Sequence, residues 1–150
     1  MSLSLKETLT EAMKAAMRAQ EKERLTTIRL ILAEIKQIEV DERIVVDDTR
    51  VLVILDKMLK QRRDSIAQFQ QAGRQDLVEV EQAQMQIIQS FMPEQLTGAE
   101  IAEMISQAIN ETGAQTVKDM GKVMAILKPK MQGRVDMAVV GNLIKQQLAV

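Results

Sequence analysis

The residues of this 150-residue chain that are best suited to chemistry are basic ones, gathered between Thr116 and Asp136. The cations of this segment are Lys118, Lys122, Lys128, Lys130 and Arg134. Clustered ammonium and guanidinium groups are typical of a surface that binds nucleic-acid phosphates, because bound cations release condensed counterions. An ordinary solvated helix face that balances nearby acids would carry the same residues. Charge alone leaves both interpretations open.

Charge is distributed unevenly along the chain, although the net charge is only −1. From Gln75 to Glu111 there are seven acidic residues and no base. From Thr112 to Val150 there are six bases and two acids, a local net charge of +4. Such segregation indicates that one part of the molecule meets an anionic partner.

The composition excludes several kinds of catalytic and metal site. There is no histidine, cysteine, tyrosine or tryptophan, which removes Cys- and His-dependent nucleophiles and thiolate or imidazole zinc sites. Acidic pairs such as Asp47 and Asp48 are typical of helix caps, and no glycine-rich phosphate loop is present. We therefore predict no catalytic residues, no cofactor and no metal. Without cysteines, a signal peptide or a membrane-length apolar run, we expect a cytoplasmic protein that does not contact membranes.

The positions of apolar residues predict an all-α fold. Almost every segment has the 3.6-residue period, and none shows sustained strand alternation. We predict an N-terminal helical domain of long helices over residues 1–92, with a loop from Asp41 to Asp48. The first helix, capped by Ser4, is expected to pack through Leu5, Leu9, Met13 and Met17, and the fourth through Leu77, Val80, Gln84, Ile87, Ile88 and Phe91.

The C-terminal part is predicted to be a compact three-helix module over residues 97–150. Its first helix begins with a capping box at Thr97–Glu100. Thr116 is expected to cap the second helix and Pro129 to end it, and Asp136 to cap the third. On this interpretation Lys118 and Lys122 share one helix face, whereas Lys128, Lys130 and Arg134 lie on the following loop.

Three further features each allow two interpretations. Gly121 lies inside a predicted helix, where glycine costs about 1 kcal/mol against alanine, so it indicates tight packing or close approach of a ligand. Arg62 falls within an apolar stripe and needs a partner, for which we expect an acid between Asp76 and Glu103; the basic cluster around it could instead contact nucleic acid. The eleven methionines are typical of an aliphatic core but also of an adaptable binding surface.

Five segments together resemble the YqeY-type small proteins of the GatB/YqeY family. They are LTTIRLILAEIKQIEVDER (Leu25–Arg43), KQRRDSIAQFQQAGRQDL (Lys60–Leu77), FMPEQLT (Phe91–Thr97), DMGKVM (Asp119–Met124) and GRVD (Gly133–Asp136). The resemblance runs through nearly the whole chain in order. In its C-terminal part the family is similar to the tail of the B subunit of the glutamine-dependent Asp/Glu-tRNA amidotransferase, although Met124 and Gly133 stand further apart here than expected in that subunit.

The resemblance implies a partner for the basic residues. In the amidotransferase the tail is implied to grip the tRNA body, so the five cations become candidate tRNA contacts. The family label also implies carbon–nitrogen ligase activity with glutamine as amide donor, but this chain lacks the kinase-like cradle and amidase that such chemistry requires. We therefore expect a non-catalytic tRNA-binding accessory protein. The alternative is an adaptor that docks through Met-rich helices on a larger enzyme, such as an amidotransferase.

Overall fold

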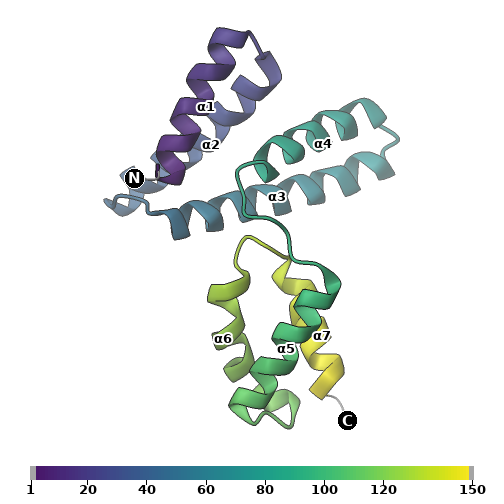
Figure 1. Cartoon of the computed structure of the whole chain (residues 1–150). Coiled ribbons are helices and arrows are strands. Elements are labelled where there is room, and N and C mark those ends of the chain that lie inside the picture. Colours follow the sequence, from purple (N-terminus) through teal and green to yellow (C-terminus); the bar gives the residue numbers. More distant parts are fainter. Residues whose placement is uncertain (1–2, 149–150) are drawn as a thin grey trace. The chain divides into compact units, whose positions relative to one another are not determined.

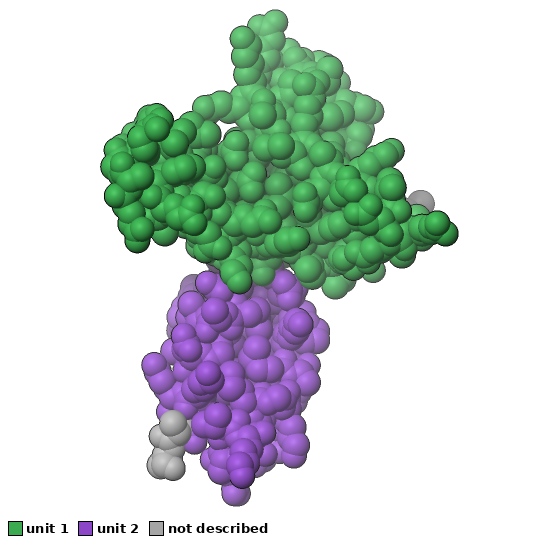
Figure 2. Space-filling model, turned by 180° about the vertical axis from the view of Figure 1, so that it is seen from behind, with its two compact units in different colours: residues 1–93 green, residues 94–150 purple. Residues whose placement is uncertain are grey.

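The computed structural model describes residues 3–148, and within them it is all helical, as predicted. The α-helices are α1 Leu5–Ala19, α2 Lys22–Glu42, α3 Asp48–Gln71, α4 Gln75–Gln89, α5 Gly98–Thr112, α6 Met120–Met131 and α7 Met137–Leu148, and a short 3₁₀ helix, η1, covers Val117–Asp119. The described residues contain no strand. The chain divides into two compact units, Met1–Pro93 and Glu94–Val150 (Figure 2).

Unit 1 consists of two helical hairpins, α1 with α2 and α3 with α4 (Figure 1). The first helix begins where the sequence predicts, because the Ser4 hydroxyl accepts a hydrogen bond from the Glu7 N–H at 3.1 Å. A single left-handed residue, Gln20 with φ of 58°, allows the sharp turn into α2. The hairpins pack mainly through α2 against α4.

The connection between α2 and α3 is shorter than the predicted loop, because α2 continues to Glu42 and only 43–47 is irregular. The Glu39 carboxylate fixes it by accepting from the Lys6 ammonium at 2.7 Å and from the Val46 N–H at 2.9 Å. Asp47 then caps α3 by accepting from the Arg50 N–H at 2.9 Å. Charged side chains from three helices therefore hold this end of unit 1 together.

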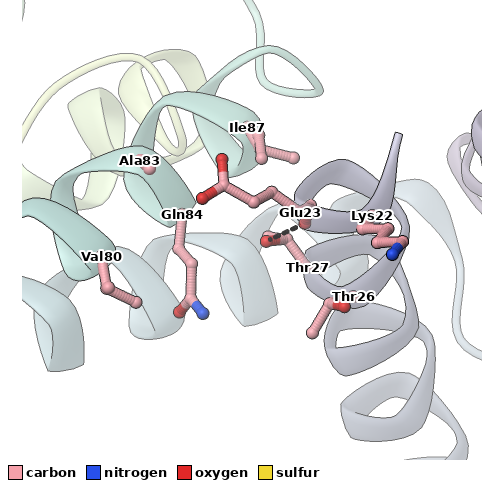
Figure 3. A pocket seen from close by; sticks show the side chains of 8 residues that line it. All are labelled: Lys22, Glu23, Thr26, Thr27, Val80, Ala83, Gln84 and Ile87. Carbon is pink, nitrogen blue, oxygen red and sulfur yellow. Dashed lines mark hydrogen bonds between the residues drawn. The ribbon is translucent and has the colours of Figure 1, made fainter. Parts of the chain in front are cut away.

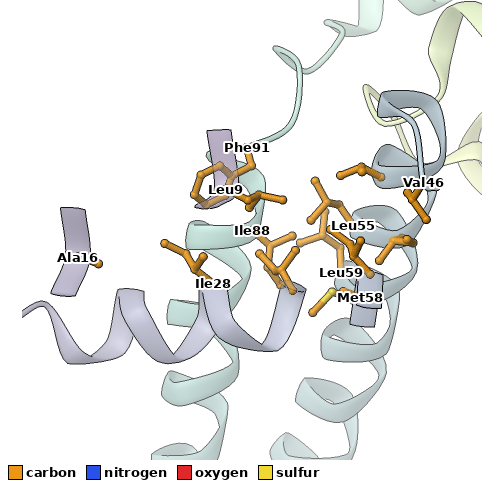
Figure 4. Close-up of a cluster of buried hydrophobic side chains, with 13 residues drawn as sticks. Leu9, Ala16, Ile28, Val46, Leu55, Met58, Leu59, Ile88 and Phe91 are labelled. Carbon is orange, nitrogen blue, oxygen red and sulfur yellow. The ribbon is translucent and has the colours of Figure 1, made fainter. Parts of the chain in front are cut away.

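The core of unit 1 is aliphatic, apart from Phe91 (Figure 4). Two predicted core positions are wrong, since Met17 and Val80 are each 50% exposed. Ala16 and Val78 are buried in their place, at 2% and 0% exposure. The helical period predicts a stripe of apolar residues along a helix, but it does not show which edge of that stripe a neighbouring helix covers. The four residues named here lie at the edges of their stripes.

Arg62 has a different partner from the predicted one. Its Nε donates to the Gln84 side-chain oxygen at 3.1 Å and its Nη1 to the Met58 carbonyl at 3.2 Å. Gln84, the one polar member of the predicted α4 stripe, thus pairs with the one basic member of the α3 stripe. A neutral amide satisfies the half-buried guanidinium without burying a carboxylate, whose desolvation would cost more.

Unit 2 contains α5, η1, α6 and α7 around a second aliphatic core. The predicted capping box is present: Glu100 N–H donates to the Thr97 hydroxyl, and the Glu100 carboxylate accepts from the Thr97 N–H. Gly113 ends α5 with φ of 66°. Asp136 caps α7 as predicted, its carboxylate accepting from the Ala138 N–H at 3.0 Å.

The prediction that Pro129 ends its helix is wrong. Pro129 lies inside α6, which continues to Met131. Proline cannot donate a hydrogen bond to the carbonyl four residues before it and crowds the preceding turn, and neither cost is avoided in the last turn of a helix. Met131 is fully buried in the core of unit 2, and this packing favours two more helical residues.

Candidate nucleic-acid interface

Three predicted cations form an exposed surface on η1 and α6, which we name the lysine surface: Lys118, Lys122 and Lys128. The opposite side of α6 is buried through Val123 and Leu127. Lys122 and Lys128 are six residues apart, about 9 Å along the helix axis. Within the described residues, none of the three lysines forms an ion pair or a side-chain hydrogen bond. Apart from a longer-range attraction between Lys122 and Asp119, their ammonium groups are free to meet an external anion.

The start of this surface is held by Asp119. Its carboxylate accepts from the backbone N–H groups of Gln115 at 3.0 Å and Thr116 at 3.3 Å. These bonds, and then the charge of Lys122, keep the pKa of Asp119 below its ordinary value of 3.8. Asp119 therefore stays ionised and shapes the turn that presents Lys118.

Lys128 and Lys130 do not lie on a loop, because α6 includes both. Residues that are two apart in the sequence are separated by about 200° around a helix. The side chains of Lys128 and Lys130 therefore leave α6 in nearly opposite directions. Lys130 lines a cavity of about 100 Å³ between α5 and α6 together with Glu111. A cation in the last turn is also favoured by the helix dipole. Lys130 is thus exposed on the side of α6 that meets α5, away from Lys128, and is not counted with the lysine surface.

Arg134 has a structural role within unit 2. Its Nε donates to the Glu94 carbonyl at 3.2 Å, and its own carbonyl accepts from the Leu96 N–H at 2.9 Å. Gly133 before it has φ of 79°, as expected for a turn glycine, and accepts from the Gln95 side chain at 3.2 Å. The Gly-Arg turn therefore fastens the segment that enters α5.

Gly121 lies on the open side of α6. A Cβ added there would meet no atom within 4 Å, so tight packing inside the described chain does not explain this glycine. The sequence interpretation of close packing against a neighbouring helix is wrong. Close approach of an external ligand remains compatible with the geometry.

Charge in unit 2 is segregated between helices. α5 carries Glu100, Glu103 and Glu111 and no base, whereas η1 and α6 together carry four lysines and one acid. The acids of α5 do not neutralise the lysine surface by direct pairing in the part of unit 2 that the structure describes. The sequence predicted this separation of charge, and the structure places the charges on different helices.

Unit 1 contains an apolar groove of about 240 Å³ between α2 and α4 that sequence reasoning did not identify (Figure 3). Two of its polar side chains are already engaged, since the Thr27 hydroxyl donates to the Glu23 carbonyl and the Gln84 side-chain oxygen accepts from Arg62. Val80 and Ile87 contribute apolar wall. No group of acidic residues able to hold a metal ion occurs among residues 3–148. This groove presents no recognisable catalytic arrangement.

The fold and the site are those of a small all-α protein with two helical units, one of which carries a cationic surface. None of the described helices is long and apolar enough to cross a membrane. The chain belongs to the YqeY family, since the family model described as "Yqey-like protein" matches residues 6–148. The resemblance inferred from the five sequence segments is therefore confirmed.

Several curated relatives carry the name "Altered inheritance of mitochondria protein 41, mitochondrial". The relative from Pyrenophora tritici-repentis is 36% identical over 121 residues, which cover 77% of this chain and 67% of the relative. The Eremothecium gossypii relative is 44% identical over 56% of this chain and 46% of its own length. The Clavispora lusitaniae relative is 39% identical over 68% and 61%. The matches span about half to two thirds of these relatives.

These names contradict the predicted cytoplasmic location. The three relatives are all named as mitochondrial proteins, so the cytoplasmic prediction is wrong. It rested on the lack of cysteines and of a signal peptide. A protein without cysteines can reside in mitochondria as well as in the cytoplasm, and amino-acid composition does not distinguish these two locations.

Proposed function

We propose that this protein binds tRNA through the lysine surface of unit 2 and does so without catalysing a reaction. The observation that carries the proposal is that Lys118, Lys122 and Lys128 are exposed and form no ion pair within the described residues. A surface of free ammonium groups binds the phosphate backbone largely irrespective of sequence. The absence of tyrosine and tryptophan from the whole chain argues against aromatic base stacking on this surface.

The resemblance to the tail of the amidotransferase B subunit supplies the choice of tRNA among anionic partners. Lys130 and Arg134, which the sequence also nominated, become secondary contacts. Lys130 shares its cavity with Glu111, and Arg134 bonds the Glu94 carbonyl, so each has less freedom to follow a phosphate than the three lysines.

Binding of tRNA to the full chain, measured by filter retention over a range of salt concentrations, tests the proposal. Three phosphate contacts predict that log Kobs falls with log salt with a slope of about −2 to −3. Lys118→Glu with Lys122→Glu should weaken binding to different tRNA species by similar factors and reduce the slope by about 2 units. Thermal unfolding should change little, since neither side chain forms an ion pair and the attraction between Lys122 and Asp119 is weak at the exposed surface.

A matched pair of single variants distinguishes an effect of the lysine surface itself from an effect of the net charge of unit 2. Lys122→Glu and Lys145→Glu change the net charge of unit 2 equally, and both residues are exposed and helical. Only Lys122→Glu should markedly weaken binding. Equal loss from both variants would indicate a diffuse charge effect, and no affinity of the unaltered chain at low salt would refute tRNA binding.

Docking through Met-rich helices has less support. Of the methionines between residues 3 and 148, only Met17 is exposed; Met58 and Met131 are buried, and the others are half-buried, most of them packed against the two cores. The methionines thus fill the interior, where aromatic residues are almost absent. An adaptor role for this protein would have to use other side chains.

A further inference from the structure

A second open groove lies in unit 1, between α3 and α4, and has a volume of about 520 Å³. We name it the glutamine groove; its lining residues are Arg63, Ile66, Gln82, Met85, Gln86 and Gln89. None of these six residues is acidic. It is shallow and open to solvent, so it would hold a molecule lying along the surface and would not enclose a small ligand.

The three glutamines share one face of α4. Gln82, Gln86 and Gln89 are spaced by four and three residues, which brings side chains to the same side of a helix. All three are exposed, and within residues 3–148 their side-chain amides make no hydrogen bond. Gln84 on the same helix differs, since its amide oxygen is bonded to Arg62. The groove therefore presents three unused amides, each with donors and an acceptor.

The rest of the lining adds a cation and an apolar floor. Ile66 and Met85 are half-buried, and Arg63 is half-buried without an ion pair or side-chain hydrogen bond among the described residues. Lys60, one turn before Arg63 on α3, is exposed and equally unpaired. A guanidinium group can stack on a planar base or bind a phosphate. Thioether and aliphatic surface suits the face of a base.

We propose that the glutamine groove binds unpaired bases of an RNA strand. Glutamine amides match the donor and acceptor edges of bases, while Arg63 stacks on a base or binds the adjoining phosphate. An extended peptide backbone could also bond to the amides, but it would give Arg63 and Lys60 no anion. The charge of the groove thus favours RNA. The proposal rests on the proposed tRNA binding and adds base contacts in unit 1 to phosphate contacts in unit 2.

Side-chain amide signals in NMR spectra of the full chain provide the direct test. Adding a short single-stranded RNA of mixed sequence should shift the NH₂ signals of Gln82, Gln86 and Gln89. The exposed Gln61 of α3 lies outside the groove lining, and its signal should stay in place. Each signal is assigned by its disappearance in the corresponding Gln→Ala variant. An uncharged peptide of extended conformation serves as the competing probe and should cause no shifts.

The effect on affinity is measured with Arg63→Gln combined with Gln86→Ala, against Gln61→Ala as control. Each lost contact should weaken binding of the single-stranded RNA by roughly tenfold, so the double variant should lose more affinity than Gln86→Ala alone, and Gln61→Ala should lose none. Gln86→Ala alone should lower affinity without changing the salt slope, because an amide releases no counterion. This distinguishes it from the lysine variants of unit 2, which change the slope.

The outcomes separate the two proposals. If tRNA binds and the lysine variants weaken it while the groove amides do not shift with either RNA, the glutamine groove is refuted and the tRNA proposal stands. If tRNA does not bind but the short RNA shifts the groove amides, the groove stands without the lysine surface. Shifts with the peptide but not with RNA would overturn the groove proposal in favour of a protein partner.

Discussion

Charged residues serve different purposes at two places in this molecule. Where α1 begins, α2 ends and α3 begins, they bond to one another: Lys6 pairs with Glu39 at 2.7 Å and Arg50 with Glu42 at 2.5 Å. On the lysine surface of unit 2, by contrast, the three lysines pair with no carboxylate in the described part of the chain. The same residue types stabilise the fold in one region and remain available to a partner in the other.

Cations that form no ion pair within the protein are the ones to associate with binding. A cation that is paired within its own unit must first break that ion pair, and the cost of breaking it reduces the free energy of binding an external anion. A cation without a partner can bind an anion at no such cost. Exposed ion pairs contribute little to stability on average, but Glu39 also fixes the Val46 backbone at 2.9 Å, so its role extends beyond one pair.

The largest effect should come from the platform beneath the lysine surface. Leu127 is 1% exposed in the core of unit 2, and Leu127→Ala should cost about 2–5 kcal/mol of unfolding free energy. Because α6 holds Lys122 and Lys128 in place, tRNA binding should be lost together with the fold of unit 2. Urea unfolding followed by circular dichroism, with binding measured in parallel, checks both effects.

Leu55→Ala is the matched control for this substitution. Leu55 is fully buried in the other core, that of unit 1, so the loss of stability should be similar in size. Binding that depends on the lysine surface should survive it. If Leu55→Ala abolished the lysine-dependent binding as completely as Leu127→Ala, the assignment of that binding to unit 2 would be contradicted.

Much of the fold follows from local sequence signals, and the departures have physical reasons. The capping residues Ser4 and Thr97 place helix starts correctly because a side-chain acceptor for a free N–H is a local requirement. The end of the helix at Pro129 was predicted wrongly, because the effect of this proline depends on how much helix follows it and on the burial of Met131. That burial is set by tertiary packing. The partner of Arg62 could not be deduced either, since Gln84 is 22 residues away and belongs to another helix.

The candidate site is predictable only in part for the same reason. The sequence shows which cations exist, and Lys118 and Lys122 are found exposed on neighbouring turns. It does not show that Arg134 bonds the Glu94 carbonyl, nor that Lys130 faces α5. The glutamine groove was missed entirely, because it needs α3 and α4 side by side and glutamine carries no charge to draw attention to it.

A smaller effect should follow from removing the charge of Glu39. The hydrogen bond from Lys6 and then that from the Val46 N–H hold the pKa of Glu39 below its ordinary value of 4.5. A carboxyl with a lowered folded pKa adds stability above its unfolded pKa and loses it as the pH falls through the folded value. Glu39→Gln should therefore lower the unfolding midpoint at neutral pH, and the difference from the unaltered protein should shrink below about pH 4.

Glu11→Gln provides the comparison for Glu39. Glu11 belongs to the exposed Lys14–Glu11 pair at 3.5 Å, which fixes no loop, so its loss should change the midpoint little at any pH. Thermal unfolding of both variants between pH 3 and 8 is the measurement. A Glu39 difference that persisted undiminished in acid would show that the charge of Glu39 is not what stabilises this end of unit 1.

The smallest effect should come from a substitution of Gly121. At this residue the backbone of α6 is open, in contrast to the end of unit 1 where charged side chains bond to one another. A Cβ there meets nothing within 4 Å, so Gly121→Ala should stabilise α6 by up to about 1 kcal/mol by restricting the unfolded chain and favouring the helix. If a tRNA phosphate approaches the backbone of α6 at this position, the added methyl should slightly weaken tRNA binding while the unfolding midpoint rises. A rise in stability with unchanged affinity would mean that tRNA contacts only the ends of the lysine side chains, and a fall in stability would contradict the open geometry at Gly121.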